Sequence, residues 1–141
     1  VMDFLELIDQ QGEGKVWSSS FLNLLEFFSK EELKWASDKD DSAGDTYCAL
    51  LPEKNINGGL KIRISIIQGD YTHCAINVGH HEDINIMTAY CLIEENRTEI
   101  NFCKRDKEIK VVIFRKENEL VKSKFQDLHD KLIRSRLGSR T

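Results

Sequence analysis

The chain has 141 residues, a formal net charge of −4 and a hydrophobic fraction of 40%. This composition is too apolar for a disordered chain, and no apolar run approaches the ~20 residues that a membrane-spanning helix needs. We therefore expect residues 1–141 to form one globular domain without a transmembrane segment. The valine at position 1 is consistent with the domain being a fragment of a larger protein.

Short helices are expected before residue 40. An apolar cluster at Phe4–Ile8 indicates a brief helix, although so short a segment could also be a first strand. The spacing of the apolar residues in Phe21–Phe28 predicts a second helix. Ser29 and Glu32 have the spacing of a capping box, which predicts a third helix from Lys30 to Trp35 or Ala36.

Six strands with short turns between them are predicted next. In the second strand, apolar residues at even positions from Leu60 to Ile66 alternate with polar residues, as in a sheet that buries one face. Turns this short leave no room for crossover helices, so neighbouring strands should pair antiparallel as a meander. The six strands are expected at residues 46–51, 60–67, 72–78, 84–93, 98–104 and 108–115.

The last predicted element is a long amphipathic helix from Glu119 to Leu137. Its apolar residues Val121, Phe125, Leu128 and Leu132 recur in steps of four, three and four, which places them on one side of the helix. This face should pack on the sheet. The predicted fold class is therefore α+β, with short N-terminal helices, an antiparallel meander of about six strands, and a C-terminal helix on the sheet.

By element order alone, this arrangement resembles two known folds. One is the pleckstrin-homology and phosphotyrosine-binding superfold, in which a C-terminal helix plugs a bent sheet. The other is the helix-grip or START-like fold, in which a long helix closes a ligand cavity. Neither family contributes a sequence motif here, and a fold does not determine a function.

Charge is distributed unevenly along the chain. Residues 1–59 contain five Lys and Arg against twelve Asp and Glu, whereas residues 104–141 contain twelve against six. A basic segment can mark a binding face. We favour the simpler interpretation that Lys131, Arg134 and Arg136 complement the helix dipole, and that Lys131 pairs with Asp127.

The four cysteines lie inside predicted strands without C-x-x-C spacing, which is typical of buried, reduced thiols in an intracellular protein. The glycosylation sequon at Asn96–Thr98 is compatible instead with a secreted protein containing two disulfides. Such short sequons are frequent by chance. We therefore expect a cytoplasmic or nuclear location.

No pattern predicts a catalytic, cofactor or metal site. His80–Asp83, with His73 and Cys74 nearby, lacks zinc-ligand spacing and is interpreted as a solvated turn. A nucleophilic pair of Cys74 or Cys91 with His80, His81 or His129 is disfavoured because both thiols are in mid-strand.

A calcium loop beginning at Asp38 is also excluded by the sequence. The sixth position is Ala43 where an EF-hand needs glycine, and the twelfth is Ala49 where it needs glutamate. The sequence pI of about 5.6 disfavours nucleic-acid binding.

The preferred hypothesis is a non-enzymatic interaction or adaptor module that binds a protein partner or a second copy of itself. The alternative is a helix-grip carrier with a small molecule or lipid bound between the sheet and Glu119–Leu137. An edge strand of a meander leaves backbone groups unpaired, so the last strand is the expected contact. The predicted interface residues are Lys110, Val112, Phe114, Arg115 and Lys116.

Overall fold

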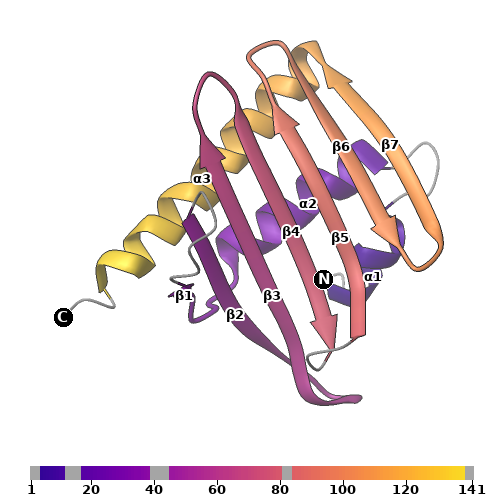
Figure 1. Cartoon of the computed structure of the whole chain (residues 1–141), viewed down its shortest axis with the longest axis vertical. Coiled ribbons are helices and arrows are strands. Elements are labelled where there is room, and N and C mark those ends of the chain that lie inside the picture. Colours follow the sequence, from indigo (N-terminus) through magenta and orange to yellow (C-terminus); the bar gives the residue numbers. More distant parts are fainter. Residues whose placement is uncertain (1–3, 12–16, 39–44, 81–83, 139–141) are drawn as a thin grey trace.

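The computed structural model describes residues 4–11, 17–38, 45–80 and 84–138 and has the α+β architecture that the sequence predicts (Figure 1). Two helices come first, a seven-stranded antiparallel meander follows, and a long helix ends the described chain. The elements are α1 (Phe4–Gln10), α2 (Trp17–Lys30), β1 (Ala36–Asp38), β2 (Asp45–Glu53), β3 (Ile56–Gln68), β4 (Thr72–His80), β5 (Ile84–Ile93), β6 (Arg97–Lys104), β7 (Lys107–Phe114) and α3 (Arg115–Gly138). Each strand pairs with its neighbour in sequence, so the sheet order is β1 to β7.

One local prediction was wrong, and one strand was missed. The predicted third helix is absent, because α2 continues to Lys30 and the hydroxyl of Ser29 donates a hydrogen bond of 3.0 Å back to the carbonyl of Glu26. Ser29 therefore closes a helix instead of starting one. The chain then forms β1, a three-residue strand that the sequence did not reveal because its pairing with β2 is a backbone property.

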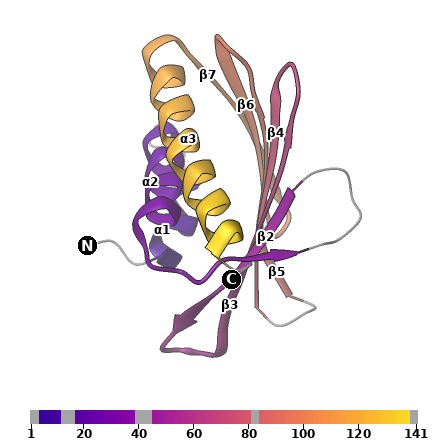
Figure 2. The same ribbon diagram turned by 90° about the vertical axis from the view of Figure 1, so that its left-hand side faces the viewer.

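All three helices cover the same face of the sheet (Figure 2). On this inner face, buried side chains of α2 and α3 pack against the inward-facing residues of the strands in one hydrophobic cluster. Phe21 of α2, for example, meets Phe102 of β6 edge to face, with 5.9 Å between the ring centroids. The opposite face, called the outer face below, has no helix over it within the described ranges.

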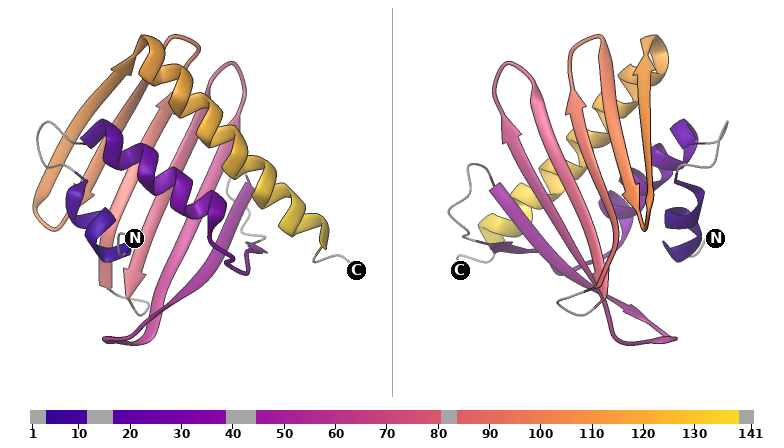
Figure 3. Two further views of the ribbon diagram at one scale, coloured as in Figure 1. Left: turned by 180° about the vertical axis from the view of Figure 1, so that it is seen from behind. Right: turned by 45° about the vertical axis from the view of Figure 1, so that its right-hand side comes forward.

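Helices α2 and α3 lie side by side across the sheet and run in the same direction (Figure 3, left). Near their C-terminal ends, the ammonium of Lys131 donates hydrogen bonds to the carbonyls of Ser29, at 3.0 Å, and of Glu31. Partial burial lowers the pKa of Lys131 from its ordinary value. Lys131 therefore satisfies carbonyls at the end of α2, a contact beyond the helical pairing that the sequence suggested.

Helix α3 starts four residues earlier than predicted, immediately after β7. Arg115 has a φ of 60° and forms the corner between strand and helix without a linker. Val121, Phe125, Leu128 and Leu132 are buried as their spacing predicted. No helix in the described ranges is both long and apolar enough to cross a membrane.

Candidate functional site

The outer face of the sheet is a surface that the described helices leave uncovered. Side chains of alternate strand residues point to it, and several large apolar ones are exposed. Sheets normally bury such side chains or use them in contacts. The exposed apolar residues whose side chains point to the outer face are Leu50, Ile67, Tyr90, Val112 and Phe114.

At one margin of this face, β7 and the start of α3 carry the five residues that the sequence predicted as an interface. Val112 is 39% exposed and Phe114 is 55% exposed, whereas their neighbours Val111 and Ile113 point inward and are buried. These exposed fractions do not fit an arrangement in which Val112 and Phe114 pack as core residues beneath the N-terminal helices. We call the following five exposed residues the β7 patch: Lys110, Val112, Phe114, Arg115 and Lys116.

Among the described residues, no strand pairs with the outer side of β7. The amide of Glu94 donates to the carbonyl of Arg97 at 2.9 Å, so these two residues are a hydrogen-bonded pair at the end of the β5–β6 hairpin. In an antiparallel hairpin, hydrogen-bonded pairs alternate with non-hydrogen-bonded pairs along the strands. Odd-numbered residues of β6 therefore bond toward β5, and even-numbered ones bond toward odd-numbered residues of β7. The N–H and C=O groups that consequently point away from the sheet belong to Glu108, Lys110, Val112 and Phe114.

The side chains and the outward-pointing backbone groups of β7 thus come from the same alternate residues. A hollow of about 400 Å³ lies beside them, lined among others by Tyr90, Leu92, Lys110 and Val112. A strand added along β7 would place its side chains next to this hollow. The site therefore offers backbone pairing and an apolar recess together.

Electrostatically, the β7 patch is basic. Lys110, Arg115 and Lys116 form no ion pair with any described residue. The adjacent Glu99 is already engaged by Arg97 at 2.7 Å. Since α3 begins at Arg115, two cations stand where the helix dipole favours anions, so helix stability does not explain their placement.

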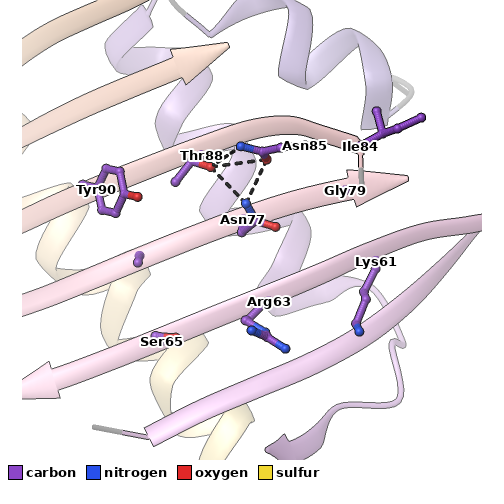
Figure 4. Close-up of a pocket in the computed structure, with 10 residues that line it drawn as sticks. Lys61, Arg63, Ser65, Asn77, Gly79, Ile84, Asn85, Thr88 and Tyr90 are labelled. Carbon is purple, nitrogen blue, oxygen red and sulfur yellow. Dashed lines mark hydrogen bonds between the residues drawn. The ribbon is translucent and has the colours of Figure 1, made fainter. Parts of the chain in front are cut away.

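A second hollow, of about 520 Å³, lies over β4 in the middle of the outer face (Figure 4). Its floor is the outward face of β4, where Ala75 and Asn77 have short side chains and Gly79 has none. Longer side chains of β3 and β5 stand on either side, because the register aligns all three strands. We call this hollow the β4 trough, and its lining residues are Lys61, Arg63, Ser65, Ala75, Asn77, Gly79, Ile84, Asn85, Thr88 and Tyr90.

The β4 trough could not be predicted from the sequence. Alternation alone could have placed Lys61, Arg63 and Ser65 on one face of their strand. Alternation does not reveal the strand register, which brings β3 next to Asn77 of β4 and β4 next to Thr88 of β5. The residues of the β7 patch, by contrast, are close together in the sequence, so their grouping could be predicted from alternation within one strand.

The cysteine and histidine candidates form no catalytic arrangement among the described residues. Cys74 and Cys91 are opposite each other on the buried inner face. The hydrogen bond with Cys74, together with burial, raises the pKa of the Cys91 thiol well above its ordinary value, which opposes thiolate formation. His129 stacks on Phe125 at 6.3 Å, a packing contact.

No three His, Cys, Asp or Glu side chains gather as metal ligands in the part of the chain that the structure describes. His80 closes β4, whereas residues 81–83 of the candidate cluster lie outside the described residues. Residues 39–44 of the excluded calcium loop that begins at Asp38 also lie outside the described residues.

Comparison of the chain with protein-family models, with curated proteins and with solved structures gives no match. The geometry of the outer face and of β7 is therefore what bears on function.

Proposed function

We propose that this chain is a non-enzymatic protein-interaction module, an adaptor within a larger intracellular assembly, that binds an extended segment of a partner protein along β7. The observation that supports the proposal is the outer side of β7, where backbone groups without a described partner strand and the exposed side chains of Val112 and Phe114 occur together. Adding a strand to an exposed sheet edge is a recurrent mode of peptide recognition.

The two ends of the sheet differ in a way that favours β7. At the other end, β1 has three residues, and short edge strands are a common protection against unwanted pairing. Strand β7 has eight residues and no described strand on its outer side. Of these two edge strands in the described sheet, β7 is the one long enough to hold a partner strand through several backbone hydrogen bonds.

The chemistry of the β7 patch indicates what the partner carries. Lys110, Arg115 and Lys116 favour acidic side chains, and Val112 and Phe114 provide apolar area to bury. Lysine on an edge strand discourages pairing with a neutral apolar strand. The expected partner segment is therefore extended, with acidic residues alternating with apolar ones.

An intracellular location fits the cysteines. All four are thiols in the structure, and Cys74 and Cys91 are buried in the core. A reducing compartment keeps such thiols as they are.

Proline substitution provides a sharp test because it removes one N–H group. At Val112 the N–H points away from β6, so Val112→Pro should block strand addition while the sheet stays intact. At Val111 the N–H bonds to β6, so Val111→Pro should instead lower the melting temperature. The measurement is binding of short random peptides, selected by display on the unaltered chain, together with the melting temperature of each variant.

Peptides rich in alternating acidic and apolar residues, bound by the unaltered chain and lost with Val112→Pro, would support the proposal. Leu50→Asp is the matched control, since Leu50 is exposed on the same face far from β7 and should not affect binding. Selected peptides that bind Val112→Pro as tightly as the unaltered chain would refute it. Sedimentation of the unaltered chain as a dimer that Val112→Pro makes monomeric would identify the partner strand as a second copy.

A further inference from the structure

A recess between α1 and the turn that joins β6 to β7 contains a buried polar atom without a described partner. Gln11, the residue after α1, lines this recess and is only 5% exposed. Its side-chain Oε1 is buried and accepts no hydrogen bond from any described residue. Nearly all buried polar atoms in folded proteins are hydrogen-bonded, so such an atom indicates a donor that the chain itself does not supply.

The position of Gln11 is fixed by two other hydrogen bonds. Its backbone N–H donates to the carbonyl of Ile8, and its side-chain Nε2 donates to the carbonyl of Leu7, each at 3.1 Å. Turning the side-chain amide over would replace the donor with the oxygen and would bring two carbonyl oxygens together. The hydrogen bond to Leu7 therefore determines that Oε1 is the atom left without a partner.

The floor of the recess is apolar. Phe102 of β6 and Ile109 of β7 are directly opposite each other in the register, and both point to the inner face of the sheet. The recess has a volume of about 290 Å³, at the small end of the range for ligand pockets. It therefore has room for a small molecule with a compact apolar group.

The rim of the recess is charged. Helix α1 lies beside the β6–β7 turn (Figure 3, right), and an ion pair between Asp9 and Lys104 joins it to the end of β6. Arg105, Asp106 and Lys107 complete the rim and form no ion pair with any described residue. Three cations against two carboxylates leave one net positive charge, which favours a ligand with a single negative charge.

The backbone of the turn does not explain the arginine in this rim. Arg105 has a φ of 55°, in the left-handed region that glycine and asparagine adopt most readily. An arginine is therefore unfavourable for the turn itself. Its side chain, with a planar set of N–H donors that matches a carboxylate, is what the position provides.

We propose that this recess, called the α1 recess below, binds a small organic acid that also carries an N–H or O–H donor and an apolar group. The carboxylate of the ligand lies against Arg105 and Lys107, and its donor bonds to Oε1 of Gln11. Its apolar group covers Phe102 and Ile109. The site is on the inner side of the sheet, apart from the outer-face residues of β7 on which the proposed function rests.

Three probes of nearly one size isolate these contacts. N-acetyl-leucine has all three groups, 2-acetoxy-4-methylpentanoate has an ester oxygen in place of the N–H, and N-acetyl-leucinamide has no charge. Each is titrated into the full chain at low ionic strength, with binding followed by changes in backbone amide NMR signals. We expect N-acetyl-leucine to shift the signals of Gln11, Arg105 and Ile109. Each of the other probes should bind about tenfold more weakly, the effect of one lost polar contact.

A variant of Gln11 tests the contact with the ligand's donor. Methionine is similar to glutamine in length but offers no comparable acceptor, so Gln11→Met should bind N-acetyl-leucine and its ester analogue equally. If Gln11 served only to end α1, the variant would have a lower melting temperature and the preference for the N–H probe would not depend on Gln11.

Two further variants test the contact with the carboxylate. Arg105→Asn removes a cation and keeps a residue that tolerates a positive φ, and Lys107→Met removes the second cation. Each should weaken binding of N-acetyl-leucine by about tenfold and leave binding of N-acetyl-leucinamide unchanged. Lys54→Met is the matched control, because Lys54 is an exposed lysine in the turn between β2 and β3 and does not line the α1 recess.

Melting temperatures close to that of the unaltered chain would show that these variants fold. An absence of signal changes with N-acetyl-leucine at millimolar concentration would overturn the proposal. So would equal binding of N-acetyl-leucine and its ester analogue by the unaltered chain, or binding that survives Arg105→Asn and Lys107→Met combined. Signal changes confined to the β7 patch would also overturn it, because the acid would then bind the basic outer edge of the sheet.

Discussion

The hydroxyl of Thr98 donates a hydrogen bond of 2.6 Å to Oδ1 of Asn118, and both side chains are buried. The amide of Asn118 in turn donates to the carbonyl of Glu95 at 3.1 Å. One side chain in the first turns of α3 therefore binds both β6 and the turn before it. Because Arg115 joins β7 to α3 without a linker, this contact helps to set the direction in which α3 crosses the sheet.

Replacing Asn118 should reveal the strength of this contact. Asn118→Leu leaves the Thr98 hydroxyl and the Glu95 carbonyl without their partner, and we expect a loss of about 2 kcal/mol in the free energy of unfolding. Urea unfolding of Asn118→Leu, Thr98→Val and the double variant measures the coupling. Strictly additive effects of the two changes would contradict a direct interaction.

The buried face of α3 should be essential for folding. Phe125→Ala creates a cavity between the helix and the sheet and should cost about 3–5 kcal/mol. Leu120→Ala is the control on the same helix, because Leu120 is 51% exposed and its truncation should cost little. A chain truncated at Glu119 that still unfolds cooperatively would show that the helix is dispensable.

Cys91 should make stability depend on alkaline pH. Its folded pKa is raised, so the contribution of the thiol is fully present below its ordinary pKa of about 9.0 and is lost as the pH rises above that value. The free energy of unfolding should fall more steeply above about pH 9 for the unaltered chain than for Cys91→Ala. Urea unfolding on both sides of that pH checks this, and equal slopes would contradict it.

Phe114 and Phe102 provide a matched pair for separating surface from core. Phe114 is exposed on the outer face, so Phe114→Asp should leave the melting temperature nearly unchanged and should abolish binding of the peptides selected on β7. Phe102 is buried against α2, so Phe102→Asp should unfold the chain. Thermal unfolding monitored by circular dichroism distinguishes the two, and unfolding of Phe114→Asp would place Phe114 in the core.

Most of the sheet could be predicted because alternation is a strong signal where one face is buried. The strand at Ile84–Ile93 was predicted with its observed bounds. The sequence signals that gave wrong helix boundaries were those at the ends of helices. Ser29 looks like a helix start but its hydroxyl bonds backward, and Arg115 begins a helix although cations are disfavoured there.

What the sequence could not reveal was the relation between elements. Lys61 and Tyr90 are distant in the chain, and only the register of β3, β4 and β5 places them around one trough. Likewise, nothing in the sequence stated that α1 and α2 would share a face with α3. Both facts depend on tertiary packing, which periodicity within one element does not encode.

The meander has a consequence for how the chain folds during synthesis. Each strand pairs with the one made just before it, so the hairpins can form in the order in which they leave the ribosome. The inner face, however, remains partly bare until α3 follows β7 and covers it. A nascent chain that stalls before α3 would expose an apolar sheet surface, the kind of intermediate that chaperones bind and that aggregates without them.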